Sequence, residues 1–314
     1  MRALLVSNMS PDEKHPERGS FVRDQFAALQ ALPGLEVELF EHRPGARALA
    51  AGALALRGRY RNTTFDVVHA HFGLSAYSAL AVRARVRALT VHGTDLIHPR
   101  TALLTRIALR HVELRAAPSR ALAELLPDPE QVEILSCGVD LERFRPLERR
   151  QARARIGVHP SRPCVLFPAD PTRAEKRFDR VRELSRALAP PHEILHLGGV
   201  APAAVPDFVN AANVVLVASE REGFGLAVLE ALACDVPVLA TPVGIHPEAL
   251  EGVPGTLCAP FAIERWADAA NAHLAAADPR IAGRARAERW SSVRMAQAVA
   301  LAWQRALASP SAQR

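Results

Sequence analysis

Two glutamates with seven residues between them stand out in SEREGFGLAVLEALACDVPVLATPVG, which spans residues 219–244. Glu230 lies in a run of Leu, Ala and Val that predicts a helix, and Glu222 precedes that helix. Glycine lets the backbone approach a ligand closely, and the first amide groups of a helix have no partner within it. A phosphate is the anion that such a helix start binds best. The amides expected to bind it are those of Phe224, Gly225 and Leu226.

Glu230 is expected roughly 6–7 Å beyond these amides along the helix axis, at a rise of about 1.5 Å per residue. A carboxylate about one sugar away from a phosphate can accept hydrogen bonds from both hydroxyls of a ribose. Glu222 would then lie on the opposite side of the phosphate, where a second sugar would bind. The alternative is compensation of the helix dipole, but that effect is confined to the first turn and Glu230 lies beyond it.

These residues need a fold that collects the ends of several strands at one edge. Apolar runs that alternate with helical patterns predict parallel sheets with helices on both faces, which bind ligands outside the carboxyl ends of their strands. The predicted strands are 3–9, 37–42, 65–71, 88–93, 115–119 and 132–136, then 164–170, 193–199, 214–219 and 236–242. The predicted helices are 21–32, 74–86, 101–112 and 119–126, then 175–189, 206–212, 225–234, 261–276 and 291–307.

The length of 314 residues predicts two domains, which leave a cleft between them. The segment CGVDLERFRPLERR, residues 137–150, interrupts the alternation with glycine, proline and charge, as a connection between domains would. We therefore expect an N-terminal Rossmann-like domain over 1–146 and a second one over 147–290. The terminal helix, within 291–314, is expected to complete the first domain.

Composition indicates a globular protein, because 49% of the residues are hydrophobic and 23% are charged. The four cysteines are far apart and form no metal-ligand spacing, which favours a reducing cytoplasm over a disulfide or zinc framework. No uninterrupted apolar run of about 18 residues occurs, and the N-terminal apolar run is too short for a signal peptide. We expect a cytoplasmic protein that does not span a membrane.

Arginine is concentrated in one part of the chain. Between Arg43 and Arg115 there are twelve arginines against Asp66, Asp95 and Glu113. Such an excess favours an anionic partner, namely lipid headgroups, nucleic acid or a phosphorylated substrate, although a solvated arginine-rich surface would show the same composition. Nucleic acid is the least favoured of these, since no DNA- or RNA-binding module is recognisable.

The segment with the two glutamates resembles the E-x7-E signature of retaining glycosyltransferases of the GT-B fold, glycosyltransferase family 4, also described as glycosyl transferases group 1. Further segments resemble the family in the same order along the chain. They are RGSFVRDQ (18–25), VHAHFG (68–73), TVHGTDL (90–96), APSRAL (117–122) and CGVDLERFRP (137–146). Together they cover most of the sequence, and they imply a GT-B architecture of two Rossmann-like domains with a cleft between them.

The resemblance implies that the C-terminal domain binds a nucleotide sugar linked to UDP, GDP or ADP. Glu230 would hold the ribose, while Glu222 and the helix amides would hold the transferred sugar and the pyrophosphate. Arg173 and Lys176, after strand 164–170, would neutralise the leaving diphosphate, a contribution that is often large in such reactions. Because these cations are present and no Asp-x-Asp cluster occurs, no metal and no cofactor is expected.

The N-terminal domain is expected to bind the acceptor, which would be a sugar, a lipid-linked molecule or another small molecule. Gly19 would let this domain close on the phosphate, and His92 would reach the sugar ring. Asp95 would orient His92 or the acceptor. His69 and His71 are expected to be structural histidines at a strand end. The arginine excess lies in this domain and predicts peripheral contact with the inner face of an anionic membrane.

Some positions depart from the family pattern. Strand 164–170 ends in Pro-Ala-Asp where relatives have Gly-Arg, so Arg173 is the expected substitute for their arginine. The region after residue 199 is shorter than in relatives, Gly244-Ile245 replaces a frequent Gly-Gly, and Asp235 replaces a frequent glycine.

The sequence thus predicts retaining transfer of a sugar to an acceptor hydroxyl, in the synthesis of cell-envelope polysaccharide or glycolipid. An alternative is a GT-B-like protein that binds nucleotides or sugars, or serves as a partner subunit, without transfer of its own. A nicotinamide dehydrogenase is disfavoured, because the loop after the first strand lacks Gly-x-Gly-x-x-Gly.

Overall fold

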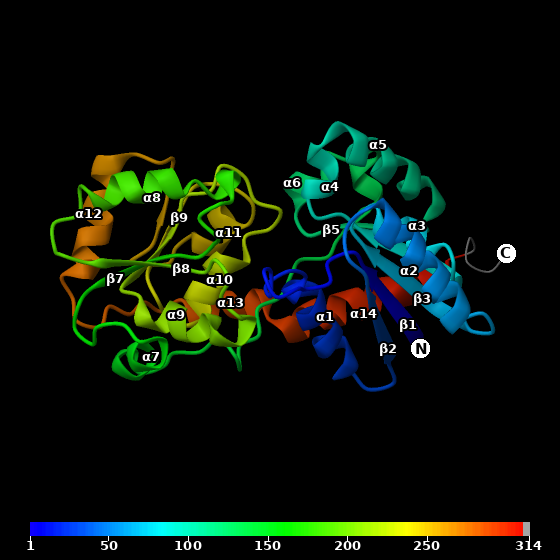
Figure 1. Ribbon diagram of the computed structural model, residues 1–314, viewed down its shortest axis with the longest axis horizontal. Helices are drawn as coiled ribbons and strands as arrows, with labels where there is room; N and C mark the ends of the chain where they lie inside the picture. Colours follow the sequence, from blue (N-terminus) through cyan, green and yellow to red (C-terminus); the bar gives the residue numbers. More distant parts are fainter. Residues whose placement is uncertain (310–314) are drawn as a thin grey trace. The chain divides into compact units, whose positions relative to one another are not determined.

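The computed structural model describes residues 1–309, and Figure 1 shows them as two units. Unit 1 is Met1–Gly138 together with the segment that begins at Ser292, and unit 2 is Val139–Ser291. Each unit contains one sheet whose strand pairs are all parallel. Of the terminal helix expected within 291–314, residues 310–314 lie outside the described part of the chain.

The sheet of unit 1 has six strands in the order β2-β1-β3-β4-β5-β6. They are β1 (Arg2–Ser7), β2 (Glu36–Glu41), β3 (Thr64–His71), β4 (Arg83–Thr90), β5 (Leu114–Ala117) and β6 (Val132–Ile134). The chain leaves β1 toward β2 on one side and later returns to place β3 on the other side. Such a reversal is a topological switch point, where open parallel sheets form their ligand-binding crevice.

Helices cover both faces of this sheet. On one face α1 (Ser20–Gln30) lies beside α14 (Ser292–Ala308), and Met295, Val299 and Trp303 of α14 are buried in a cluster with strand residues (Figure 1). The indole N–H of Trp303 donates to Nδ1 of His69 on β3 over 3.0 Å, which fixes this distant helix on the sheet. The other helices of unit 1 are α2 (Ala46–Arg59), α3 (Ser75–Ala79), α4 (Thr94–Ile97), α5 (Pro99–Ala108), η1 (Leu109–His111), α6 (Arg120–Ala123) and η2 (Pro129–Gln131). Residues of α2, α3, α5 and α6 form the core of the opposite face.

The helix predicted over 74–86 is wrong in its second half. The helix α3 ends at Ala79, and β4 begins at Arg83. The segment RARVRALT alternates Arg with small or apolar residues in its first part, and this period of two places Val86 in the core and Arg85 at the surface. Apolar residues can satisfy a helical and a strand pattern over so short a stretch, and here pairing with β3 decides between them.

The sheet of unit 2 has five strands in the order β11-β10-β9-β7-β8. They are β7 (Cys164–Phe167), β8 (Glu193–His196), β9 (Val214–Val217), β10 (Val238–Ala240) and β11 (Leu257–Cys258). The chain leaves β7 toward β8 and then returns to place β9 on the other side of β7. The switch point of this sheet therefore lies between β7 and β9.

Helices also cover both faces of the second sheet (Figure 1). The helices α8 (Phe178–Ser185) and α12 (Ile263–Leu274) bury Leu184 and Trp266 against one face. On the other side α10 (Leu226–Ala233) contacts α9 (Val205–Ala211) and α13 (Arg284–Ala287), and α7 (Arg149–Ile156) packs on α9. The remaining elements are η3 (Ala174–Lys176), η4 (Pro202–Ala204), α11 (His246–Leu250) and η5 (Glu288–Trp290).

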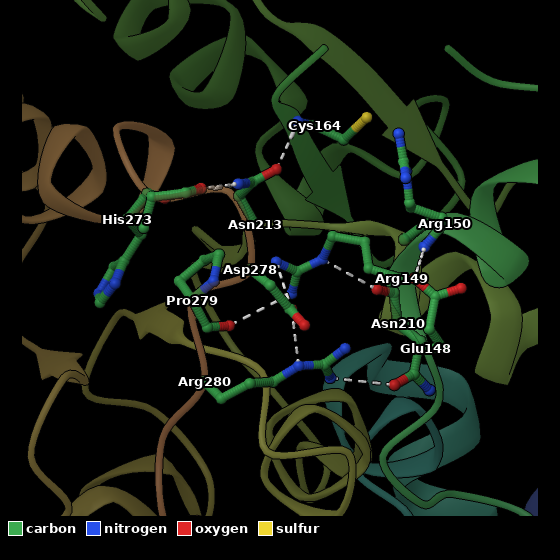
Figure 2. A network of polar contacts seen from close by, with 12 residues as sticks. Glu148, Arg149, Arg150, Cys164, Asn210, Asn213, His273, Asp278, Pro279 and Arg280 are labelled. Atoms are coloured by element: carbon green, nitrogen blue, oxygen red, sulfur yellow. Dashed lines mark hydrogen bonds and ion pairs between the residues drawn. The ribbon is translucent and has the colours of Figure 1, made fainter. Parts of the chain in front are cut away.

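Buried arginines hold the start and the end of unit 2 together, as Figure 2 shows around Arg149. Arg149 donates to the carbonyls of Asn210 and Pro279, both over 3.2 Å, and lies 2.9 Å from the carboxylate of Asp278. Burial, followed by the neighbouring charge of Arg280, lowers the pKa of Arg149 to about 10. The charge is still compensated, because the carbonyl of Asn210 at the end of α9, the carbonyl of Pro279 and the carboxylate of Asp278 all lie against the guanidinium.

The same kind of contact accounts for the boundary between the units, which falls after Gly138 although it was expected after residue 146. Arg284 donates to the carbonyls of Leu141 and Phe144, both over 2.8 Å. Arg280 donates to the carbonyl of Leu147 over 2.8 Å. The segment that follows Gly138 is therefore attached to unit 2 by its backbone.

Within residues 1–309 no helix has both the length and the apolar character needed to cross a bilayer. All four cysteines are free thiols.

Candidate functional site

The switch point of unit 2 brings together two residues that are 46 positions apart in the sequence. Lys176 follows β7 and Glu222 follows β9, and the Lys176 Nζ lies 2.7 Å from both Oε1 and Oε2 of Glu222. The two loops are also joined by their backbones, since the amide of Glu220 donates to the carbonyl of Glu175 over 2.9 Å. The sheet order thus places a cation and a carboxylate in the crevice where such sheets bind ligands.

The carboxylate of Glu222 is ionised and largely enclosed. Its side chain is 8% exposed, that of Lys176 is 17% exposed, and the Ser219 hydroxyl donates to Oε1 over 2.6 Å. Burial alone would raise the pKa of Glu222, but the Lys176 ammonium and the Ser219 hydroxyl outweigh it, so this pKa lies below its usual value. Glu222 remains charged at neutral pH.

The start of α10 offers backbone donors next to this pair. Gly225 is the N-cap residue with φ of 111°, a conformation that favours glycine. The carbonyl of Phe224 is engaged, because it accepts from the amide of Ile245 over 2.8 Å. Among the described residues, however, no group accepts a hydrogen bond from the amides of Phe224, Gly225 and Leu226. The geometry provides the unpaired amides that were expected to bind an anion.

Glu230 lies on the one open face of α10. Leu226, Ala227 and Glu230 are partly exposed, whereas the other five residues of this helix are buried. Residues at positions i and i+4 share a helix face, so Glu230 lies one turn beyond Leu226 on the side that solvent reaches. The carboxylate is therefore not enclosed in the core, although the composition of the helix suggested it.

The structure does not bring Arg173 to this pair. Its guanidinium binds Oε1 of Glu175 through Nε and Nη2 at 2.9 and 2.7 Å, and half of the side chain is exposed. Its assignment to the diphosphate stays a prediction, and Lys176 is the cation that contacts Glu222 in this unit.

In unit 1 the predicted residues lie at the carboxyl edge of the first sheet. Gly19 precedes α1 with φ of 69°, and a Cβ atom there would lie 2.4 Å from the carbonyl oxygen of Met9. Only glycine permits this close approach between the start of α1 and the loop after β1.

His92 follows β4, and its ring contacts those of Phe21 and Phe72, with centroid distances of 4.7 and 4.6 Å, while these two rings also contact each other. Its Nε2 is 3.1 Å from Nδ1 of His71, the last residue of β3. Burial, followed by the neighbouring His71, lowers the pKa of His92 well below its usual value, so the ring is neutral near pH 7.

Asp95 acts on the backbone around His92. Its Oδ1 accepts from the amide of His92 over 3.0 Å, and its Oδ2 accepts from the amide of Gly73 over 3.1 Å. The carboxylate is almost fully buried, and its two hydrogen bonds join the loops after β3 and β4. The orienting role expected for Asp95 stays a prediction.

Four residues of these edges were not assigned to a site from the sequence. His69 is the buried structural histidine that was expected, bound to Thr90 and Trp303. His71 differs, because it contacts His92; the pairing of β3 with β4 could have suggested this contact. Ser219 and His246 carry no motif of their own and were found only from their neighbours, Glu222 and Gly225.

Comparisons with known proteins agree with this arrangement. The family model described as "Glycosyl transferases group 1" matches residues 159–289, and "Glycosyltransferase Family 4" matches residues 6–143. The D-inositol 3-phosphate glycosyltransferases of Mycolicibacterium paratuberculosis and Mycobacterium avium are each 30% identical over 293 residues, covering 76% of this chain and 66% and 68% of theirs. The chain thus spans about two thirds of the length of these curated relatives.

Solved structures show the same fold. Sucrose-phosphate synthase from Thermosynechococcus elongatus superposes with a TM-score of 0.79 at 16% identity, covering 98% of this chain and 99% of that one. Anabaena HepE in complex with UDP-glucose superposes with a TM-score of 0.72 at 18% identity, covering 97% of this chain and all of that one, 100%. The predicted fold class, two parallel-sheet α/β domains of the GT-B type, is confirmed.

Proposed function

This chain belongs to the family of glycosyl transferases group 1, and on that premise we propose that it transfers a sugar from a nucleotide diphosphate sugar to an acceptor hydroxyl. The observation that carries the proposal is the Lys176–Glu222 pair beside the unpaired amides of α10, at the switch point of the second sheet. A cation and backbone amides suit the diphosphate, and a carboxylate suits the hydroxyls of a sugar. UDP-glucose is bound by Anabaena HepE, which shares the fold.

Each site residue of unit 2 that contacts the donor has a role in this proposal. The amides of Phe224, Gly225 and Leu226 bind the diphosphate, and Glu230 accepts hydrogen bonds from the ribose. Lys176 stabilises the negative charge that develops on the leaving diphosphate. Two of its three N–H donors are used by Glu222, so one remains for a phosphate oxygen.

We assign retention of configuration to the reaction. Glu222 binds the transferred sugar on the face opposite the incoming acceptor, and the leaving phosphate accepts the proton of the acceptor hydroxyl. The bond from the anomeric carbon to the phosphate breaks while a bond to the acceptor oxygen forms on the same face. This scheme needs no protein nucleophile and no metal, because Lys176 and the helix amides neutralise the diphosphate.

Turnover with UDP-, GDP- and ADP-linked sugars tests the proposal. We expect release of the nucleoside diphosphate from at least one donor and an α-configured product from an α-linked donor, measured by NMR of the anomeric proton. Glu222→Gln keeps the size of the side chain and removes its charge, and we expect it to lower kcat at least about 100-fold. Tight nucleotide binding without turnover on any donor would instead support a binding protein or partner subunit.

We further propose that the acceptor or its surroundings are anionic and that unit 1 meets the inner face of a membrane. On α5 the side chains of Leu103 and Leu104 are 61% and 40% exposed, and Ile107 is exposed on the same face. Arg100 and Arg106 on α5 and Arg110 on the η1 turn that follows it are also exposed, and none of them forms an ion pair with another described residue. Apolar and basic side chains on one helix face favour an anionic lipid surface.

Co-sedimentation with vesicles tests the membrane contact. We expect binding to vesicles that contain phosphatidylglycerol and little binding to phosphatidylcholine alone, with a loss in the double variant Leu103→Ser, Ile107→Ser. Leu301→Ser is the matched control, because Leu301 is an exposed leucine on α14, which packs on the opposite face of the sheet. Equal and negligible binding to both kinds of vesicle would refute the contact.

A further inference from the structure

A buried histidine lies directly behind the start of α10. His246 is the first residue of α11 and has no exposed surface. A Cβ atom built on Gly225 would lie only 2.5 Å from Nε2 of this imidazole and 2.7 Å from its Cδ2. The ring edge that carries Nε2 is therefore packed against the residue that begins the anion site.

The hydrogen bonding of this histidine defines its tautomer. Nδ1 lies 2.8 Å from the carbonyl oxygen of Thr241, which can only accept, so Nδ1 carries a proton. Nε2 has no partner among the described residues and no contact with solvent. A neutral His246 thus has an unsatisfied buried acceptor, and a protonated one presents a charged donor at the same place, which an anion in front of Gly225 would stabilise.

Polar groups connect His246 with the Lys176–Glu222 pair. The Thr241 hydroxyl donates to the carbonyl of Ser219, and the Ser219 hydroxyl donates to Glu222. The charged groups that act on the imidazole are Glu222 and Lys176. Burial lowers the pKa of His246 and Lys176 adds to this, while Glu222 and the bond to Thr241 raise it. These opposing effects leave the ring neutral, and a further negative charge nearby would raise its pKa.

We propose that His246 is a proton-linked positioning residue of the anion site, which takes up a proton at Nε2 when a donor diphosphate binds in front of α10. This inference rests on the proposed function, because the diphosphate supplies the charge. A negative group at the amides of Gly225 and Leu226 favours the imidazolium directly behind them. The proton comes from solvent, and no bond of the donor changes in this step.

Proton uptake has a definite sign. In the free protein the pKa of His246 is below its ordinary value, and a diphosphate in front of α10 raises it, so affinity for the donor falls as pH rises from the pKa of the free protein to that of the complex. We therefore expect a net uptake of protons in this pH window, at most one for each donor bound. Within that window the affinity should fall by up to about tenfold per pH unit.

Isothermal titration calorimetry with UDP-, GDP- and ADP-glucose in two buffers of different ionisation enthalpy measures this uptake. These donors suit the experiment because both of their phosphates are esterified and do not titrate near pH 6.5. The main variant is His246→Asn, whose amide can keep the bond to Thr241 but has no titratable nitrogen, and we expect its proton uptake to be near zero. His246→Gln is a second variant in case the first does not fold, as judged by circular dichroism.

His192→Asn is the matched control, because His192 precedes β8 at the amino edge of the same sheet and is bonded to Ser185. We expect it to bind with the proton uptake of the wild type. Binding of a donor with equal uptake in the wild type and the His246 variants would overturn this inference alone. If the wild type bound none of the three donors, the proposed function would fail and this inference would fail with it.

Discussion

Replacing Lys176 by Met tests whether the pair at the switch point is the charged centre of unit 2. The change removes the ammonium and leaves the aliphatic part of the side chain in place. Glu222 would then keep Ser219 as a hydrogen-bond partner but lose the cation that holds both of its oxygens at 2.7 Å. An enclosed carboxylate without its counter-charge is strongly unfavourable, and removing one member of a buried pair costs about 3–5 kcal/mol. Because Lys176 is 17% exposed, we expect a loss near the lower limit, about 3 kcal/mol at pH 7.5.

The loss must depend on pH in one direction. In the wild type the lowered pKa of Glu222 contributes stability that is present above the pKa of glutamate in the unfolded chain and is lost as pH falls through the folded value. In Lys176→Met burial is no longer opposed by Lys176, so the pKa of Glu222 rises above its usual value. The variant then relieves its unfavourable charge by binding a proton, and its deficit shrinks from pH 7.5 toward about pH 4.5.

Hydrogen exchange of peptides from β9 and α10, followed by mass spectrometry at several pH values, measures this stability within unit 2. Arg173→Met is the matched control, since it removes a cation from the same loop whose pair with Glu175 is half exposed, and we expect a loss below about 1 kcal/mol. A deficit of Lys176→Met that stays constant from pH 7.5 to 4.5 would show that packing, and not charge, determines it. Equal deficits in both variants would refute the distinction between the two cations.

Three further predictions concern other parts of the molecule. Arg149→Met should destabilise unit 2 by about 2–4 kcal/mol in urea unfolding, because two buried carbonyls lose their donor. Arg155→Met is the control on the same helix. Its side chain is 55% exposed and pairs with Asp207, so its loss should cost below about 1 kcal/mol. Gly225→Ala should cost more stability than Gly199→Ala, since both glycines have positive φ but only an alanine at 225 would place its Cβ against His246. In a double-mutant cycle, His246→Asn should recover part of that difference. Burial lowers the pKa of His71 to about 3, so unit 1 should lose stability as pH falls below about 6.5. His71→Gln should reduce the slope of stability against pH by about 1.4 kcal/mol per pH unit, measured by hydrogen exchange of β3 and β4 peptides. An unchanged slope would assign the acid sensitivity to other groups.

Short apolar runs predicted most strands of both sheets within a few residues, because helices cover both faces and bury these strands, and a period of 3.6 predicted most of the longer helices. The same patterns failed for 83–86, where Arg alternates with Ala and Val next to a helix of five residues. They also failed at α7, since Arg149 and Arg153 are buried and an arginine-rich segment has the composition of an exposed connection. Their burial depends on carbonyl groups supplied by α9 and by the loop before α13, which no local pattern contains.

The spacing of Glu222 and Glu230 could be read from the sequence, because both belong to one loop and its helix. The partner of Glu222 could not, since Arg173 and Lys176 follow β7 within three residues of each other and either could have reached β9. The local geometry decides between them. Arg173 folds back onto Glu175 two residues away, which leaves Lys176 to bridge the loops after β7 and β9.

The choice of lysine at this position has a chemical consequence. The guanidinium of an arginine would bind a carboxylate or a diphosphate as a planar fork, whereas the ammonium of a lysine is a compact charge with three donors that can serve two anions at once. Lys176 holds both oxygens of Glu222 and retains one donor, so a diphosphate at the amides of α10 need not displace Glu222 to be neutralised. A lysine here therefore keeps the carboxylate in place for the transferred sugar while the phosphate charge is neutralised. Lys176→Arg tests this: we expect turnover to fall more than donor affinity, because the fork satisfies the phosphate but changes the position of Glu222. A variant with wild-type kcat would show that the geometry of the cation is unimportant.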